Sequence, residues 1–127
     1  MVYFIGAGPG DPELITVKGK RLIQEADVIV YTGSLVNPAL LSEIKKTATV
    51  YNSASMTLKE VMEVICQAVR DGKKTVRVHT GDPSLYGAVR EQMAELSRQG
   101  IDYEVIPGVS SFLAAAASLR RERCFSI

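Results

Sequence analysis

The stretch that decides the fold of this chain reads Thr80-Gly81-Asp82-Pro83-Ser84-Leu85-Tyr86-Gly87. The residues before it, 74–79, have the composition of a strand, and the residues after it, 88–98, have that of a helix. The octet is therefore predicted to be a strand-to-helix turn of an α/β unit. In open parallel sheets, ligands bind beyond the carboxyl ends of the strands, where such turns lie.

Three residues of the octet make a ligand-binding turn chemically reasonable. Gly81 allows close approach of backbone to a ligand, because it has no Cβ. Pro83 fixes its own φ and holds Asp82 extended. The Asp82 carboxylate can bind backbone amides, the start of the next helix or a bound hydroxyl. Two interpretations stay open at this point: a ligand-binding turn, or an ordinary turn in which Asp82 caps the helix.

Length and composition indicate a single globular domain. The chain has 127 residues, a hydrophobic fraction of 46% and a formal net charge of +1, which excludes disorder and gives no basic surface for nucleic acid. It contains no apolar run long enough for a membrane span and starts without a basic signal-peptide region, so we expect a cytoplasmic protein. Cys66 and Cys124 lack metal-binding spacing, and we expect no metal site and a core position for Cys66.

Predicted strands and helices alternate along the chain. The expected strands cover residues 2–5, 28–31, 48–51, 74–79 and 102–106. The expected helices cover residues 17–25, 39–44, 58–69, 88–98 and 112–119. Such alternation predicts an α/β fold class: a five-stranded, mainly parallel sheet with helices on both faces.

The glycine-rich turn after the first strand, residues 6–12, resembles a dinucleotide-binding fingerprint but does not complete it. The fingerprint needs glycine where this chain has Asp11, and Pro9 removes an amide that could face a phosphate. The acidic residue expected after the second strand is also missing, because Thr32 stands there. A nucleotide-dependent oxidoreductase fragment is therefore the weakest alternative. Asp11 is expected either to cap the next segment or to contact a ligand.

The chain's other reactive side chains favour binding over covalent catalysis. His79 is the only histidine; at the end of a strand, it is expected to be packed or hydrogen-bonded rather than to act as a base. Ser110 and Ser111 do not lie in a G-x-S-x-G motif and are expected to cap a helix or contact a ligand. The turns at residues 8–10, 80–86 and 107–111 leave one edge of the sheet, an arrangement suited to orienting a reactive small molecule.

Five motifs in order resemble the tetrapyrrole methylases, a family of class III S-adenosylmethionine-dependent methyltransferases. Residues 5–19 resemble the family's opening motif, and residues 80–87 and 106–111 match two further motifs. Residues 31–38 and 52–58 resemble the branch that methylates C-11 of precorrin-4 or cobalt-precorrin-4 in cobalamin biosynthesis. The resemblance implies that activity, with a cofactor folded between this domain and a second α/β domain.

The resemblance also implies a set of site residues and partners. The cofactor contacts fall on Pro9, Thr80, Gly81, Asp82, Leu85, Ser110 and Ser111, with Tyr86 lining the same pocket. The substrate side is expected to include Ser34, Asn52, Ser53 and Met56. Relatives that methylate uroporphyrinogen carry an aspartate, proposed as a base, where this chain has Thr32, so no catalytic base is assigned. The expected partners are a small tetrapyrrole and a second copy in a homodimer, with no nucleic acid or membrane.

The resemblance covers residues 1–119, which we expect to form the amino-terminal domain of such an enzyme. Residues 120–127 form an atypical tail where the second domain would begin. Family members are longer, so we expect an amino-terminal half produced by truncation, cleavage or a frame shift. A non-catalytic ligand-binding or assembly module is the alternative to a methyltransferase half, and the presence of cobalt in the substrate stays open.

Overall fold

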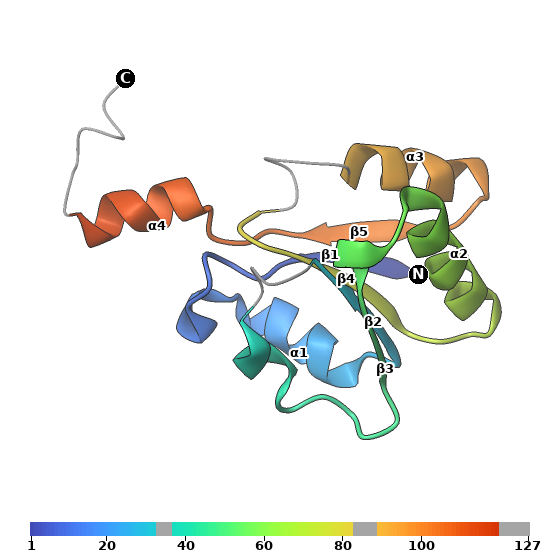
Figure 1. Cartoon of the computed structure of the whole chain (residues 1–127), viewed down its shortest axis with the longest axis horizontal. Coiled ribbons are helices and arrows are strands. Elements are labelled where there is room, and N and C mark those ends of the chain that lie inside the picture. The colour runs from blue at the N-terminus through green and yellow to red at the C-terminus, as the bar shows by residue number, and fades with distance from the viewer. Residues whose placement is uncertain (33–36, 83–88, 120–127) are drawn as a thin grey trace.

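The core of the computed structural model, which describes residues 1–32, 37–82 and 89–119, is a five-stranded parallel sheet. The strands are β1 (Val2–Gly6), β2 (Val28–Tyr31), β3 (Thr49–Asn52), β4 (Thr75–His79) and β5 (Tyr103–Ile106). Their order across the sheet is β3-β2-β4-β1-β5, and every neighbouring pair is parallel (Figure 1). The predicted fold class is confirmed, and each strand lies within one residue of its expected ends.

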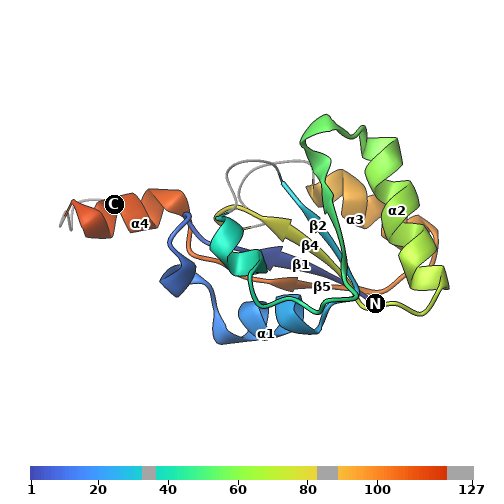
Figure 2. The ribbon, with the colours of Figure 1, turned by 60° about the horizontal axis from the view of Figure 1, so that its bottom comes forward.

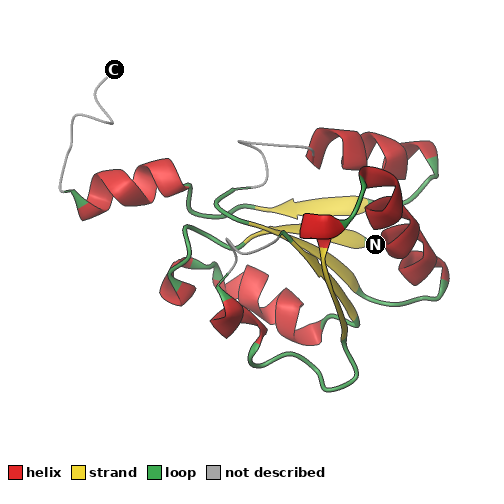
Figure 3. Cartoon of the chain, in the orientation of Figure 1, coloured by secondary structure: helices red, strands yellow, loops and turns green. Residues whose placement is uncertain are grey.

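Helices cover both faces of the sheet. Helix α1 (Val17–Glu25) lies on one face, and α2 (Leu58–Arg70) and α3 (Val89–Arg98) lie on the other (Figure 2). Helix α4 (Ser111–Ser118) follows β5 and extends away from the carboxyl edge of the sheet (Figures 1 and 3). No helix among the described residues is long and apolar enough to cross a membrane.

Strand alternation builds a separate hydrophobic cluster on each face. Phe4 and Val30 join Ile65 and Leu96 beneath α2 and α3. The opposite cluster includes Ile5, Ile23, Ile29, Val76 and Val78 beneath α1. Because the side chains of a strand point to opposite faces in turn, the sheet is buried on both sides, as in other parallel sheets.

Side chains cap the starts of α1 and α2. The Thr16 hydroxyl caps α1 by accepting a hydrogen bond from the amide of Gly19 at 3.0 Å. Gly19 costs helix propensity, but a Cβ there would lie 3.1 Å from the Ile5 side chain, so its absence lets α1 pack closely on β1. Thr57 and Glu60 form a capping box at the start of α2.

One local prediction was wrong. The helix expected over residues 39–44 is a shorter 3-10 helix, η3 (Pro38–Leu41), with proline in its first turn and the Asn37 side chain as its cap. A further 3-10 turn, η4 (Ser53–Ser55), follows β3. Leu58, the first residue of α2, is 41% exposed, because its side chain tilts back toward the start of the helix.

The order of connections places a topological switch point between β1 and β4. The chain leaves β1 through α1 and reaches β2 on one side, whereas it leaves β4 through α3 and reaches β5 on the other side. The two connections cover opposite faces of the sheet (Figure 2). Ligands of open α/β sheets bind outside the carboxyl ends of the strands at such a point, so the turns after β1 and β4 define the candidate site.

Candidate binding site at the carboxyl edge of the sheet

The turns that follow β1 and β4 are joined directly. Gly8 and Gly81 form an antiparallel bridge, in which the Gly81 amide donates to the Gly8 carbonyl at 2.8 Å and the Gly8 amide donates in return at 3.3 Å. Both glycines have positive φ, 77° for Gly8 and 61° for Gly81, a conformation that side chains disfavour. The two motifs that were expected at one edge of the sheet are therefore in contact.

A third turn, after β5, contacts the first two turns at Gly6 and Gly81. A Cβ on Gly108 would lie 2.1 Å from the carbonyl oxygen of Gly81, and a Cβ on Gly6 would lie 2.5 Å from it. Neither distance leaves room for a side chain. We expected Gly81 to allow approach of a ligand; what the structure shows is that its carbonyl approaches the backbones of Gly6 and Gly108.

Asp82 links the turns after β4 and β5. Its Oδ2 accepts a hydrogen bond from the Gly108 amide at 3.1 Å, in a partly buried environment. Binding to a backbone amide, one of the roles considered for Asp82, is confirmed. The alternative that it caps the following helix stays a prediction, because residues 83–88, between Asp82 and the described part of α3, lie outside the described residues.

Two other polar residues of the motifs cap short elements. The buried Ser110 hydroxyl accepts a hydrogen bond from the Phe112 amide at 3.2 Å and caps α4. The Asp11 carboxylate accepts one from the Glu13 amide at 2.9 Å and caps the 3-10 helix η1 (Pro12–Leu14). The capping roles predicted for these residues are confirmed, and their contact with a ligand stays a prediction.

The other predicted cofactor residues lie at or next to these turns. Pro9 and Thr80 are half-buried and flank the Gly8–Gly81 bridge along the chain. Ser111 is the first residue of α4. Leu85 and Tyr86 belong to the same octet but lie outside the described residues, as does the substrate-side candidate Ser34.

The substrate-side candidates lie at the ends of β2 and β3. The Ser53 hydroxyl donates to the carbonyl of Tyr31 at 3.0 Å and so ties the end of β3 to the end of β2. Asn52 uses its side-chain oxygen to accept from the Ala54 amide at 2.9 Å. Met56 is half-buried against the cluster beneath α2. The structure brings these three candidates together, but on the β3 side of the sheet rather than at the glycine turns.

A buried polar group on β4, which the sequence analysis did not anticipate, lies between those two regions. Arg77 is 5% exposed; its Nε donates to Gln92 Oε1 and its Nη1 to the Val30 carbonyl, both at 3.2 Å. Burial lowers the pKa of Arg77 to about 10, so the guanidinium stays protonated at neutral pH. The signal in the sequence was the alternation of β4, which places Arg77 and His79 on one face and apolar residues on the other.

His79, the last residue of β4, is packed and neutral. Its ring stacks on Phe4 with a centroid distance of 6.3 Å, and its Nδ1 lies 3.5 Å from the hydroxyl oxygen of Thr32. Burial, with a smaller contribution from the Arg77 cation, lowers the pKa of His79 to about 3. The interpretation of His79 as a packed or hydrogen-bonded residue is confirmed, and its low pKa makes it a poor base at neutral pH.

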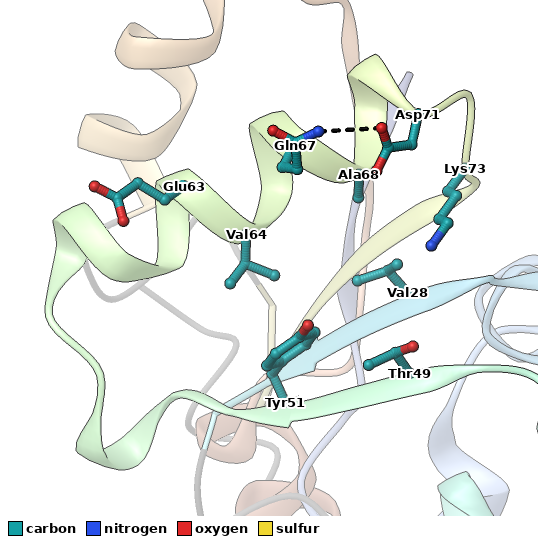
Figure 4. Close-up of a pocket in the computed structure, with 9 residues that line it drawn as sticks. All are labelled: Val28, Thr49, Tyr51, Glu63, Val64, Gln67, Ala68, Asp71 and Lys73. Atoms are coloured by element: carbon teal, nitrogen blue, oxygen red, sulfur yellow. Dashed lines mark hydrogen bonds between the residues drawn. The ribbon is translucent and has the colours of Figure 1, made fainter.

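Two surface hollows lie away from this edge. One, of about 410 Å³, runs between β3 and α2 and is lined by polar and apolar residues alike (Figure 4). The lining residues are Val28, Thr49, Tyr51, Glu63, Val64, Gln67, Ala68, Asp71 and Lys73. The other, of about 440 Å³, lies between α2 and α3. Neither contains a residue of the glycine turns, and within the described ranges no group of His, Cys, Asp or Glu could hold a metal ion.

A parallel α/β sheet whose first, fourth and fifth strands end in three interlocked glycine turns is the arrangement that the sequence motifs predicted. The chain belongs to the Tetrapyrrole (Corrin/Porphyrin) Methylases, whose family model matches residues 1–125. Among individual relatives, it is 64% identical over 121 residues to the cobalt-precorrin-4 C(11)-methyltransferase of Methanocaldococcus jannaschii. That match covers 95% of this chain and 47% of the relative.

Solved structures agree with the fold. A cobalt precorrin-4 methyltransferase, described as a cobalamin biosynthetic enzyme, superimposes with a TM-score of 0.89 at 53% identity, covering 92% of this chain and 49% of that one. A uroporphyrin-III C-methyltransferase from Thermus thermophilus, complexed with S-adenyl homocysteine, superimposes with a TM-score of 0.78 at 37% identity. The latter match covers 91% of this chain and 47% of that one. The chain thus spans about half the length of the relatives it matches.

Proposed function

We propose that this chain forms the amino-terminal domain of an S-adenosylmethionine-dependent enzyme. That enzyme methylates C-11 of precorrin-4 or cobalt-precorrin-4 in cobalamin biosynthesis. The observation that carries the proposal is the closure of the turns after β1, β4 and β5 at the topological switch point. This closure occurs in a chain that is similar along 95% of its length to a cobalt-precorrin-4 C(11)-methyltransferase.

The residues at the closed turns fit a small cofactor held largely by backbone. Pro9, Thr80, Gly81, Asp82 and Ser110 would hold it, joined by the motif residues Leu85, Tyr86 and Ser111. The Cβ-free contact of Gly6, Gly81 and Gly108 keeps the three turns together and supports this assignment. When bound, the cofactor supplies a methyl group already activated by its sulfonium, so the chain has no need of a nucleophile. The role of these residues is to orient the donor and exclude water.

The tetrapyrrole would be contacted from the β2–β3 side, by Ser34, Asn52, Ser53 and Met56. The hydrogen bond from Ser53 to Tyr31 supports this part of the proposal, because it holds the end of β3 against the end of β2. The residues there would position the ring carbon in line with the methyl group. Orientation of this kind supplies several kcal/mol or more of the barrier reduction.

The proposal is tested by joining this chain to the carboxyl-terminal half of the M. jannaschii relative, which restores the length that the relatives have. The completed protein is supplied with S-adenosylmethionine and with precorrin-4 or cobalt-precorrin-4, and the product is examined by mass spectrometry. We expect one added methyl group on the ring. A folded protein that binds S-adenosylhomocysteine but never methylates the ring would favour the alternative, a ligand-binding module. Binding of neither ligand would contradict both.

We further propose that the working unit is a homodimer, as the family resemblance implies. The exposed apolar side chains of α4 and of its C-cap residue support self-association: Phe112 is 58% exposed, Leu113 44% and Leu119 66%. Light scattering on the 127-residue chain should detect dimers or larger species. The Phe112→Ser variant should shift the distribution toward monomer, and a strict monomer before any substitution would contradict this part of the proposal.

A further inference from the structure

The contact between Thr32 and His79 joins the ends of two neighbouring strands. Tyr31 of β2 pairs with Val78 of β4, so Thr32 and His79 follow as the next pair at the carboxyl edge. The Thr32 amide and hydroxyl both donate to the Val78 carbonyl at 3.2 Å. The Thr32 hydroxyl oxygen also lies 3.5 Å from Nδ1 of His79, at the long end of hydrogen-bond distances.

This network selects one tautomer of the His79 ring. Because the Thr32 hydroxyl hydrogen points to the Val78 carbonyl, the hydroxyl oxygen presents a lone pair to His79. In that arrangement Nδ1 carries the ring proton and donates it. In a neutral imidazole the other nitrogen, Nε2, is left as an unprotonated acceptor.

Nε2 is buried, and among the described residues it has no hydrogen-bond partner. Protonation at neutral pH would not satisfy it, since burial and the nearby Arg77 cation both disfavour a charged ring. A buried acceptor without a donor is costly, and native proteins leave few of them. A ligand that brings its own donor would remove this cost.

We propose that His79 Nε2 accepts a hydrogen bond from a neutral N–H or O–H group of the bound ligand, and that Thr32 is the positioning residue that keeps Nε2 free of a proton. The inference rests on the proposed function, which sets two sources for the donor. His79 directly precedes the cofactor candidates Thr80 and Gly81, and Thr32 stands two positions before the substrate candidate Ser34.

The chemistry of the surroundings narrows the donor. A ligand carboxylate has no proton to donate, and an ammonium group would be repelled by the buried Arg77 cation. The remaining donors are the adenine amine and ribose hydroxyls of the methyl donor, or a ring N–H of a metal-free tetrapyrrole. A ring that holds cobalt lacks that N–H. A comparison of the metal-free and the cobalt-containing ring therefore tests whether the tetrapyrrole is the donor.

The tautomer can be read directly by nitrogen NMR. The 127-residue chain has one histidine, so its ¹⁵N-labelled spectrum contains one imidazole. We expect a protonated Nδ1 and a bare Nε2 from pH 8 down to about pH 5. A protonated Nε2, or an Nε2 already hydrogen-bonded in the absence of ligand, as by a trapped water, would overturn the proposal.

The ligand experiments use the chain completed with the relative's carboxyl-terminal half. The His79→Phe variant identifies the nitrogen signal of His79, because that signal is lost from its spectrum. S-adenosylhomocysteine, metal-free uroporphyrin III and cobalt uroporphyrin III are each added to saturation, which calorimetry verifies. An Nε2 shift with the first ligand alone assigns the donor to the cofactor, and a shift with the metal-free ring alone assigns it to the substrate. If S-adenosylhomocysteine and metal-free uroporphyrin III both saturate the protein and neither shifts Nε2, this inference is overturned while the proposed function stays intact. If neither of these two ligands binds, the result contradicts the proposed function instead.

Variants of Thr32 separate a positioning role from a structural one. Thr32→Val keeps the shape but removes the hydroxyl, so the ring should populate both tautomers and the affinity for the assigned ligand should fall about three- to tenfold. Thr32→Ser should restore both the tautomer and the affinity. Loss of affinity with an unchanged tautomer would overturn the role given to Thr32.

Discussion

The two halves of the carboxyl edge are held together in different ways. Around β1, β4 and β5, the turns interlock mainly through backbone atoms and through glycines that leave no room for a Cβ, with the Asp82 carboxylate as a further link. Around β2 and β3, side chains make the ties, from Ser53 to Tyr31 and between Thr32 and His79. A backbone closure of this kind forms a constant framework, whereas side-chain ties can change with the ligand. We infer that the first half serves the shared cofactor and the second the particular substrate.

The largest loss of stability is expected at Gly108, where the backbones of the turns approach most closely. Gly108→Ala should destabilise the fold by about 3 kcal/mol, because its Cβ would lie 2.1 Å from the Gly81 carbonyl oxygen and the turns would have to separate. Urea unfolding measures the change. The matched control is Gly100→Ala, in open space at φ 71°, which should cost only about 1 kcal/mol of backbone strain. Equal losses at both positions would contradict the closure.

The second-largest effect is a loss of stability in acid, caused by His79 in the half that side chains hold together. His79 has its pKa lowered to about 3 in the folded protein, against an ordinary value of 6.5 in the unfolded chain. As pH falls from about 6.5 toward 3, the unfolded chain takes up a proton that the folded protein does not, so stability is lost. The loss between pH 7 and pH 5 should be about 2 kcal/mol.

The His79→Phe variant is the control for that titration, because it keeps a ring against Phe4 but cannot take up a proton. Other groups also titrate in acid: Asp27, for example, has its pKa lowered chiefly by the hydrogen bond from the Lys74 amide. The difference between the two unfolding curves therefore isolates His79. Parallel curves from pH 7 to pH 5 would mean that His79 titrates normally.

The third effect concerns Asp82, whose carboxylate makes a side-chain contact within the half around β1, β4 and β5. Asp82→Ala removes the tie to the Gly108 amide and should cost about 1.5 kcal/mol of stability. In the completed protein, it should also weaken S-adenosylhomocysteine binding by about tenfold, as measured by calorimetry, if the turns hold the cofactor. Asp82→Asn keeps an acceptor and should retain most of the stability. A destabilised Asp82→Ala protein with unchanged affinity would limit Asp82 to a structural role.

The smallest effect is expected at Ser53. Ser53→Ala removes the hydroxyl that donates to Tyr31 and should cost about 1 kcal/mol in urea unfolding. In the completed protein it should raise the KM for the tetrapyrrole and leave the affinity for S-adenosylhomocysteine unchanged. Weakened cofactor affinity would contradict the division of the edge into two halves.

Local patterns were sufficient to predict most of the elements. The apolar spacing of α1 and α2 and the apolar runs of β2 and β5 all depend on residues close in the chain, where propensity and periodicity act. The incorrect prediction was local as well. Pro38 starts a 3-10 helix that periodicity alone does not distinguish from an α-helix.

By itself, the sequence determined the α/β class, the glycine motifs and the family resemblance, because these depend on residue types and short spacings. Only the tertiary structure decided that Asp82 binds the Gly108 amide and that Thr32 meets His79. Those contacts depend on the strand order β3-β2-β4-β1-β5, which sets β4 between β2 and β1 although β3 and α2 precede it in the chain. Strand order arises from the packing of both hydrophobic faces and the handedness of each crossover, which no local stretch of residues encodes.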